Sequence, residues 1–208
     1  MSNKCAVLIV GIDQWEKYTS PLIDSISMYE PTVQIVVVDN ASTTPYPLTG
    51  EVVRSETRLS YAAAINLAAE NTDADWLLSI NNDTICTAPF MHLLDGLKDT
   101  SYYARQIIQE GRLVWFGNWI VLIPRKVWNE VGPFDPAFQM CGFEDADYAA
   151  RALKYDFKVE WLDLPFTHFW GKTRWCIPNY PEIRENNIRY FKLKHGYKLG
   201  DSMVVLRD

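Results

Sequence analysis

Two mostly apolar segments of the sequence end in carboxylates that can take part in chemistry. Residues 76–80 are followed by Asn81-Asn82-Asp83, and residues 33–38 are followed by Asp39. Apolar runs of this length predict buried parallel strands. Because the carboxyl ends of parallel strands form the ligand-binding edge of an open α/β sheet, we expect Asp39 and Asp83 at one rim. A carboxylate there can hold a divalent metal against a phosphorylated ligand, whereas a simple turn is the alternative.

Another pair of carboxylates, Glu144 and Asp145, opens a segment with helical periodicity. The core-facing positions of this predicted helix are Ala146, Ala149, Ala150 and Leu153, and Asp145 borders them. Asp147 falls on another face, four residues before Arg151, which predicts a surface ion pair. The positive end of the helix dipole favours the ionised form of carboxylates in the first turn. Such a group can act as a general base, and helix capping is the commoner role at this position.

Residues 163–175 form a third informative segment, after a strand expected over residues 157–162. His168 lies between aromatic residues, where a packed ring and a metal ligand are both open interpretations. Lys172 and Arg174 follow it and can bind a diphosphate, although the spacing of a P-loop is absent. The tryptophans with side chains suited to packing on a sugar ring are Trp119, Trp170 and Trp175, and core packing is the alternative for each.

Composition and charge bound the class of protein. The chain has 208 residues, 48% hydrophobic and 22% charged, which fits one globular domain. Its four cysteines lack metal-ligand spacing and are expected to be reduced and mostly buried. No apolar run reaches the ~20 residues that cross a bilayer, and no signal-peptide pattern opens the chain, which predicts a soluble cytoplasmic protein.

Charge is unevenly distributed along the chain. The net charge of -6 argues against a nucleic-acid coat, yet residues 172–198 carry seven Lys or Arg and two Glu. This basic segment can meet a substrate phosphate, a polyanion or an anionic membrane surface, which would place the protein at the periphery of a membrane. A solvated helix face is the alternative for its later part.

Strands and helices alternate through the first half of the chain. Expected strands cover residues 6–11, 33–38, 51–53 and 75–80, and expected helices begin at a Ser20 cap with Pro21 and behind a Ser60 cap. This alternation predicts an α/β fold with parallel pairing. A helix is expected over residues 90–98, and the β-branched and aromatic runs at 102–108 and 113–123 indicate a mixed or antiparallel second half.

Five segments, in this order, resemble the family 2 glycosyltransferases with the GT-A fold, in particular the bacterial rhamnosyltransferase-like members. They are residues 36–43, residues 59–66, Asn81-Asn82-Asp83, residues 132–135 with 144–147, and His168, spread over residues 5–175. The resemblance implies one GT-A-type domain over residues 1–208, with a Rossmann-like, mostly parallel sheet and a mixed C-terminal half. Within it, the nucleotide-binding half is residues 1–100, the acceptor and catalytic half is 101–178, and a basic helix and tail form 179–208.

The resemblance also implies an activity and a site. The activity is inverting transfer of a hexosyl or deoxyhexosyl group from a nucleoside-diphosphate sugar, UDP- or dTDP-linked, to an acceptor hydroxyl, with Mn²⁺ or Mg²⁺ as cofactor. Asp83 and His168 would bind the metal, and Asp145, beside Glu144, would be the general base. The donor-binding residues would be Asp39, Arg58, Asn82, Lys172 and Arg174. Asn81 stands where many members have Asp, which leaves fewer charged metal ligands.

Two other functions stay open at this point. A nucleotidyltransferase also presents carboxylates at an α/β rim, but no glycine-rich basic loop follows the first strand. A catalytically silent nucleotide-sugar or carbohydrate-binding module is compatible with Asn81. The acceptor also stays open among a lipid-linked glycan, another glycan, a protein and a hydroxylated DNA base, and the sequence does not indicate an oligomeric state.

Overall fold

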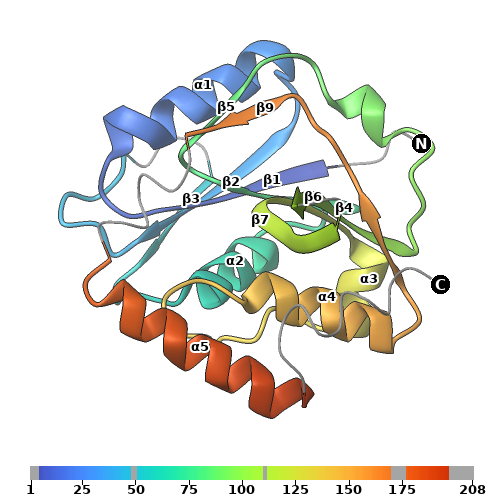
Figure 1. Cartoon of the computed structure of the whole chain (residues 1–208). Coiled ribbons are helices and arrows are strands. Elements are labelled where there is room, and N and C mark those ends of the chain that lie inside the picture. Colours follow the sequence, from blue (N-terminus) through green and yellow to red (C-terminus); the bar gives the residue numbers. More distant parts are fainter. Residues whose placement is uncertain (1–4, 48–50, 110–111, 170–176, 197–208) are drawn as a thin grey trace.

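A seven-stranded mixed sheet forms the centre of the protein. The computed structural model describes residues 5–47, 51–109, 112–169 and 177–196 (Figure 1). The strands of this sheet, in spatial order, are β3 (Glu51–Ser55), β2 (Gln34–Asn40), β1 (Cys5–Gly11), β4 (Trp76–Asn81), β7 (Arg112–Pro124), β6 (Ser101–Gln109) and β8 (Lys158–Trp161). A separate two-stranded antiparallel sheet consists of β5 (Thr84–Cys86) and β9 (Phe166–His168).

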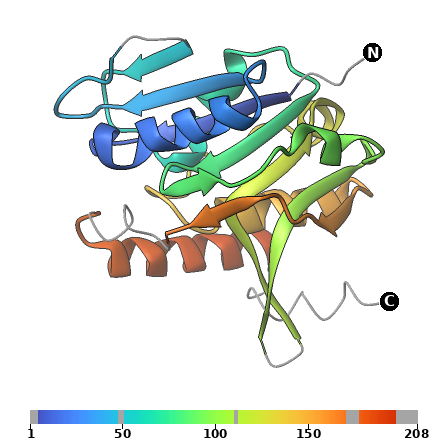
Figure 2. The same ribbon diagram turned by 90° about the horizontal axis from the view of Figure 1, so that it is seen from above.

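The strand directions confirm the predicted α/β class with a mixed second half. Strands β1 to β4 pair in parallel. Strand β7 runs antiparallel to both β4 and β6, and β8 is parallel to β6. Figure 2 shows β6 and β7 extending together as a ribbon beyond the rest of the sheet. The apolar runs of the first half therefore lie in the parallel part, where strands are covered on both faces.

Helices cover both faces of the sheet. The helical elements are the π-helical turn η1 (Trp15–Thr19), α1 (Ser20–Tyr29), α2 (Tyr61–Glu70), the 3₁₀ turn η2 (Met91–Leu94), α3 (Arg125–Val131), α4 (Glu144–Lys154) and α5 (Tyr180–His195). Helix α1 and the β5–β9 sheet lie on one face, and α2, α3 and α4 lie on the other (Figure 1). Helix α5 lies outside α2 and α4.

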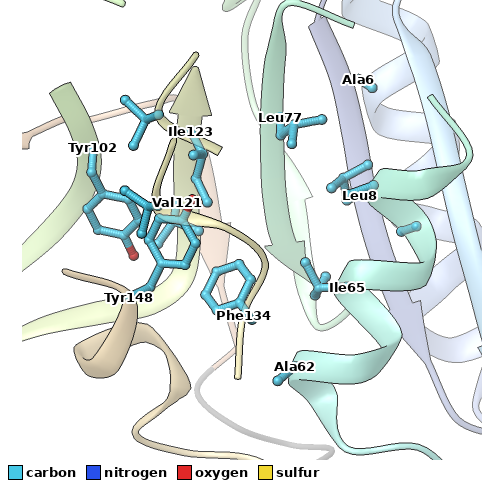
Figure 3. Close-up of a cluster of buried hydrophobic side chains, with 14 of the residues drawn as sticks. Ala6, Leu8, Ala62, Ile65, Leu77, Tyr102, Val121, Ile123, Phe134 and Tyr148 are labelled. Carbon is cyan, nitrogen blue, oxygen red and sulfur yellow. The ribbon is translucent and has the colours of Figure 1, made fainter. Parts of the chain in front are cut away.

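Alternating side chains of the strands build two cores. Leu8 of β1 belongs to the core beneath α2 and α4, whereas its neighbours Val7 and Ile9 belong to the core beneath α1. Figure 3 shows the first core, where Ile65 of α2 and Tyr148 of α4 approach the sheet. Each fully buried aliphatic side chain contributes roughly 1.5–3 kcal/mol relative to an exposed one. These cores fix the strand ends that carry the polar residues.

Several local predictions differ from the structure. The helix expected over residues 90–98 is only the short turn η2, and Gly96 just beyond it has a φ of 84°, which a helix does not accommodate. The Glu30 side chain accepts hydrogen bonds from the amides of Phe90 and Met91 at the start of this turn. Ser20 is the first residue of α1 and not its cap, because the π-helical turn η1 leads directly into that helix. Ser60 does cap α2, accepting a hydrogen bond from the amide of Ala63 at 3.3 Å.

Two further expectations concern cysteines and membranes. Cys5 and Cys86 are buried, as expected, while Cys141 is half-buried and Cys176 lies outside the described residues. Among the described ranges, no helix is both long and apolar enough to cross a bilayer.

Candidate active site

Strand register brings the predicted carboxylates to one edge of the sheet. Gly11 of β1 pairs with Asp39 of β2, and on the other side of β1 Val10 pairs with Asn81 of β4. Asp39 and the Asn81-Asn82-Asp83 segment therefore flank the end of β1. This is the carboxyl edge at which open α/β sheets bind ligands.

Asp83 and His168 form a buried pair at this edge. The β5–β9 sheet sets the pair, because Thr84 is opposite His168 and the amide of Phe169 donates to the carbonyl of Asp83 at 2.9 Å. The Nε2 atom of His168 lies 3.1 Å from Oδ1 of Asp83. The Asp83 side chain is 0% exposed and that of His168 is 9% exposed. The two predicted metal ligands are thus neighbours, although they come from different elements.

The two atoms of this pair lie within hydrogen-bond distance of each other, and the same separation would also suit two ligands of one metal ion. Two ligand atoms at adjacent corners of an octahedron, each about 2.1 Å from a Mg²⁺-sized ion, are about 3.0 Å apart. Within the part of the chain that the structure describes, no group of three His, Cys, Asp or Glu side chains is close enough to hold a metal. A metal at Asp83 and His168 would therefore take further ligands from a bound diphosphate or water.

Trp119 of β7 supports the histidine ring. Its indole stacks on the imidazole of His168 with ring centroids 5.0 Å apart and an angle of 6° between the planes. The guanidinium of Arg105 lies 5.3 Å from the centroid of Trp119, within cation–π distance. The stacking makes Trp119 a neighbour of His168, and only 5% of Trp119 is exposed. Packing of Trp119 against a sugar stays a prediction.

Asp39 is held by a dense set of hydrogen bonds. The amides of Ser42 and Tyr46 each donate to its carboxylate at 3.0 Å, and the guanidinium of Arg54 also contacts it. Burial alone would raise the pKa of Asp39, but the bonds from Ser42, Tyr46 and Arg54 hold that pKa below its usual value. Asp39 is therefore a fixed anion at the rim.

The contact between Arg54 and Asp39 was not predicted from the sequence. The sequence indicated a short strand at this point but not its neighbour, and only the β2–β3 register places Arg54 directly beside Asp39. A basic residue near the end of the short strand that follows the Asp39 strand in the chain is the signal that was available.

Asn82 belongs to a buried polar chain that reaches the hydroxyl of Tyr46. Its side-chain amide donates to Oγ1 of Thr19 at 3.2 Å, and Thr19 lies 3.3 Å from the hydroxyl of Tyr46. A Cβ atom on Gly11 would come within 2.3 Å of that hydroxyl, so the end of β1 must be glycine. Asn82 thus has a structural partner at the rim, and contact with a donor stays a prediction.

Glu144 and Asp145 form the first turn of α4, where both are buried. Tyr61 of α2 and Tyr102 of β6 lie near them, and burial together with the two negative charges raises the pKa of both hydroxyls. Burial, and next the charge of Glu144, raise the pKa of Asp145 well above its usual value. The expected effect of the helix dipole, which would lower the pKa of this group, does not prevail at Asp145, because the cost of removing the charge from water is larger.

Asp147 also differs from its prediction. It does pair with Arg151 at 2.8 Å, as expected, but its side chain is buried and not at the surface. Lys194 and His195 of α5 contact its other oxygen at 2.7 Å and 2.8 Å. The sequence interpretation failed because the helix that covers this face comes from a segment distant in the chain.

The structure does not bring Arg58 into this arrangement. Arg58 is exposed in the connection between β3 and α2, and its side chain makes no hydrogen bond or ion pair within the described ranges. Trp170, Lys172, Arg174 and Trp175 lie outside the described residues.

Comparison with known proteins identifies the fold. Neither a family model nor a curated protein sequence matches the chain. Solved structures do match, and several of them contain nucleotides. The mannosyltransferase PcManGT from Pyrobaculum calidifontis, in complex with GDP-Man and Mn²⁺, has a TM-score of 0.64 and 15% identity over 76% of this chain and 54% of that chain. The chain has a GT-A-type glycosyltransferase fold.

Two other structures show the same likeness. S. aureus TarS with UDP has a TM-score of 0.60 and 14% identity over 78% of this chain and 59% of that chain. GalNAc-T7 with UDP, GalNAc and Mn²⁺ has a TM-score of 0.64 and 14% identity over 96% of this chain and 55% of that chain. The chain spans little more than half the length of these proteins, and identity this low shows the fold alone.

Proposed function

We propose that this chain is a metal-dependent, inverting glycosyltransferase that uses a nucleoside-diphosphate sugar. The observation that carries the proposal is the Asp83–His168 pair at the carboxyl edge, with its 3.1 Å separation. The fold, shared with glycosyltransferases solved with GDP-Man or UDP, supports the same class of donor. The rhamnosyltransferase-like affiliation, and the division into a donor half and an acceptor half at about residue 100, belong to this proposal.

Donor binding would use the rim on both sides of β1. Asp39 would contact the nucleobase of the donor, because Arg54 and backbone amides hold the Asp39 carboxylate in place as an anion. Asp83 and His168 would hold the divalent ion, Mn²⁺ or Mg²⁺. When bound, such an ion stabilises the negative charge that develops on the departing diphosphate.

Proton transfer would fall to the start of α4. As the acceptor oxygen forms its bond to the anomeric carbon, the bond from that carbon to the diphosphate oxygen breaks, and Asp145 takes the acceptor's hydroxyl proton. Only the ionised form of Asp145 can take this proton, and a raised pKa makes that form a stronger base. Glu144 would help by raising the pKa of Asp145 through its charge.

A donor screen tests this proposal. Thermal unfolding is followed with UDP-, dTDP- and GDP-sugars, each with Mn²⁺ and with EDTA. One sugar nucleotide should raise Tm by about 5 °C or more at about one hundred times its Kd, and EDTA should abolish the shift. A shift with no subsequent turnover would favour the silent binding module, and no shift with any donor would count against the proposal.

A further inference from the structure

The loop before Glu144 has an unusual backbone. Met140, Gly142 and Phe143 all have positive φ values, of 48°, 100° and 77°. Only glycine adopts such angles without steric cost, so two of these three residues are strained. Phe143 is the residue directly before Glu144, and it has no side-chain capping bond. The direction in which α4 starts therefore depends on whatever holds this loop.

One buried side chain of α5 holds it. The amide group of Asn187, only 1% exposed, bonds to the loop backbone at several points. Its oxygen accepts from the amide of Gln139 at 2.8 Å. Its nitrogen donates to the carbonyls of Gln139 and Gly142, each at 2.9 Å, and lies 3.3 Å from that of Cys141. A single asparagine thus fixes the backbone across the strained segment.

Other contacts tie α5 to the region on both sides of this loop. Phe191 packs in a small core with Phe143, Phe138 and Ala146. Lys194 bridges Asp135 and Asp147 at 2.6 Å and 2.7 Å. Helix α5 therefore contacts the chain before the loop, the loop itself and the first turns of α4, as its position in Figure 1 suggests.

The opposite side of the loop meets α2. The carbonyl of Met140 accepts a hydrogen bond from the amide of Tyr61 at 2.5 Å, and the hydroxyl of Tyr61 lies 3.2 Å from that of Ser79 in β4. The loop is thus fixed between α5 and the central sheet, with Glu144 and Asp145 immediately after it.

We propose that Asn187 is a positioning residue: by holding the strained backbone of residues 139–143, it sets where the carboxylates of Glu144 and Asp145 lie. Its catalytic consequence rests on the proposed function, because it acts through Asp145. In the described part of the chain, the hydrogen bonds of the Asn187 side chain all go to the backbone of residues 139–142, and none goes to Asp39, Asp83 or His168. Its loss should therefore change turnover and leave donor binding at the Asp39–Asp83 rim intact.

The test compares Asn187→Ala and Asn187→Asp with two controls. Asn187→Asp keeps an acceptor for the Gln139 amide and loses the donor to the carbonyls. Among the described residues, the side chain of the neighbouring Asn186 hydrogen-bonds only to the side chain of Gln139, at 3.4 Å, so Asn186→Ala is the local control. Leu22→Ala removes a fully buried side chain beneath the opposite face of the sheet and controls for a general loss of stability. Each variant is studied well below its Tm.

Two readouts separate positioning from stability. The first is amide hydrogen exchange over residues 139–145 without substrate. The second is kcat beside the Kd for the donor. Both Asn187 variants should exchange faster in this segment and lose kcat by at least about tenfold, with donor Kd changed less than about threefold. Asn186→Ala and Leu22→Ala should retain kcat.

Three results would overturn the proposal. These are unchanged exchange in the Asn187 variants, a donor Kd that weakens in proportion to kcat, and an equal loss of kcat in Leu22→Ala. The wild type could fail to bind or turn over any sugar nucleotide while exchange rises as expected in the Asn187 variants. In that case the proposed function is wrong, and the conclusion that Asn187 fixes the loop backbone is retained.

Discussion

His168 and Asp83 meet with 3.1 Å between Nε2 and Oδ1, although they are 85 residues apart in the chain. The small β5–β9 sheet makes this possible, because it returns the chain to the end of β4 after the whole second half of the central sheet has been built. The pair therefore exists only in the folded protein, and it joins the two halves of the sequence at one point.

Removing the imidazole should weaken metal-dependent donor binding. His168→Ala is expected to raise the Kd for UDP in Mn²⁺ by at least about tenfold, because the ion would lose one of its two protein ligands. Calorimetric titrations with Mn²⁺ and with EDTA measure this directly. His92→Ala, an exposed histidine in η2, is the matched control and should bind normally. Equal Kd values for wild type and His168→Ala would remove His168 from the site.

The indole of Trp119 should affect Mn²⁺ affinity, because it holds the imidazole of His168 in its orientation. Trp119→Phe keeps a flat ring against the imidazole and should change Mn²⁺ affinity less than about threefold, whereas Trp119→Leu should weaken it by about tenfold. The measurement is free Mn²⁺ by electron paramagnetic resonance during titration. Trp161→Leu changes an indole that is 55% exposed and is the control. Identical affinities for the Phe and Leu variants would contradict a stacking role.

Asp145 should cost the folded protein stability near neutral pH. Its raised pKa means that the folded state keeps a proton which the unfolded state has released, so stability falls as pH rises above about 4 toward the folded pKa. Asn at this position ionises in neither state, so Asp145→Asn should escape this loss and raise Tm at about pH 7.5, by about 3 °C for each kcal/mol regained. Asp147→Asn should instead lower Tm, because Arg151 loses its carboxylate partner and Lys194 loses one of its two. A lower Tm for Asp145→Asn would show that its charge is well satisfied.

His195 should make the protein less stable in mild acid. Burial lowers its pKa below the usual value, against the opposing effect of Asp147, while Lys154 and Lys194 lower it further. The unfolded chain therefore takes up the proton first, and stability falls as pH drops through about 6.5 toward the folded pKa. Urea unfolding at about pH 7.5 and about pH 5.5 should show a larger loss for the wild type than for His195→Gln. A pH-independent difference between the two proteins would contradict this.

Local sequence patterns predicted the parts of the fold that depend on local physics. The apolar runs before Asp39 and Asn81 are strands because burial on both faces requires such runs. Their carboxyl ends share an edge because parallel pairing with crossover helices leaves no other arrangement. The Ser60 cap was predictable for the same reason, since capping is a contact between near neighbours.

The missed features depend on contacts between distant segments. The buried state of Asp147 follows from α5, and no periodicity within residues 144–154 indicates which helix will cover that face. Arg54 meets Asp39 only through the register of two strands. Asp145 has an altered pKa because of what surrounds it in space, which outweighs the dipole effect that the sequence suggested.

The most direct test of the central claim is turnover of the donor selected by the thermal screen. Release of nucleoside diphosphate is measured with Mn²⁺ for the wild type, Asp83→Asn and Asp145→Asn, with donor Kd measured beside it. The wild type should turn over the donor, Asp145→Asn should bind it with little change and release at least about 100-fold less product, and Asp83→Asn should lose metal-dependent binding. Binding without turnover in the wild type, or full turnover in Asp83→Asn, would contradict a glycosyltransferase that works through this rim.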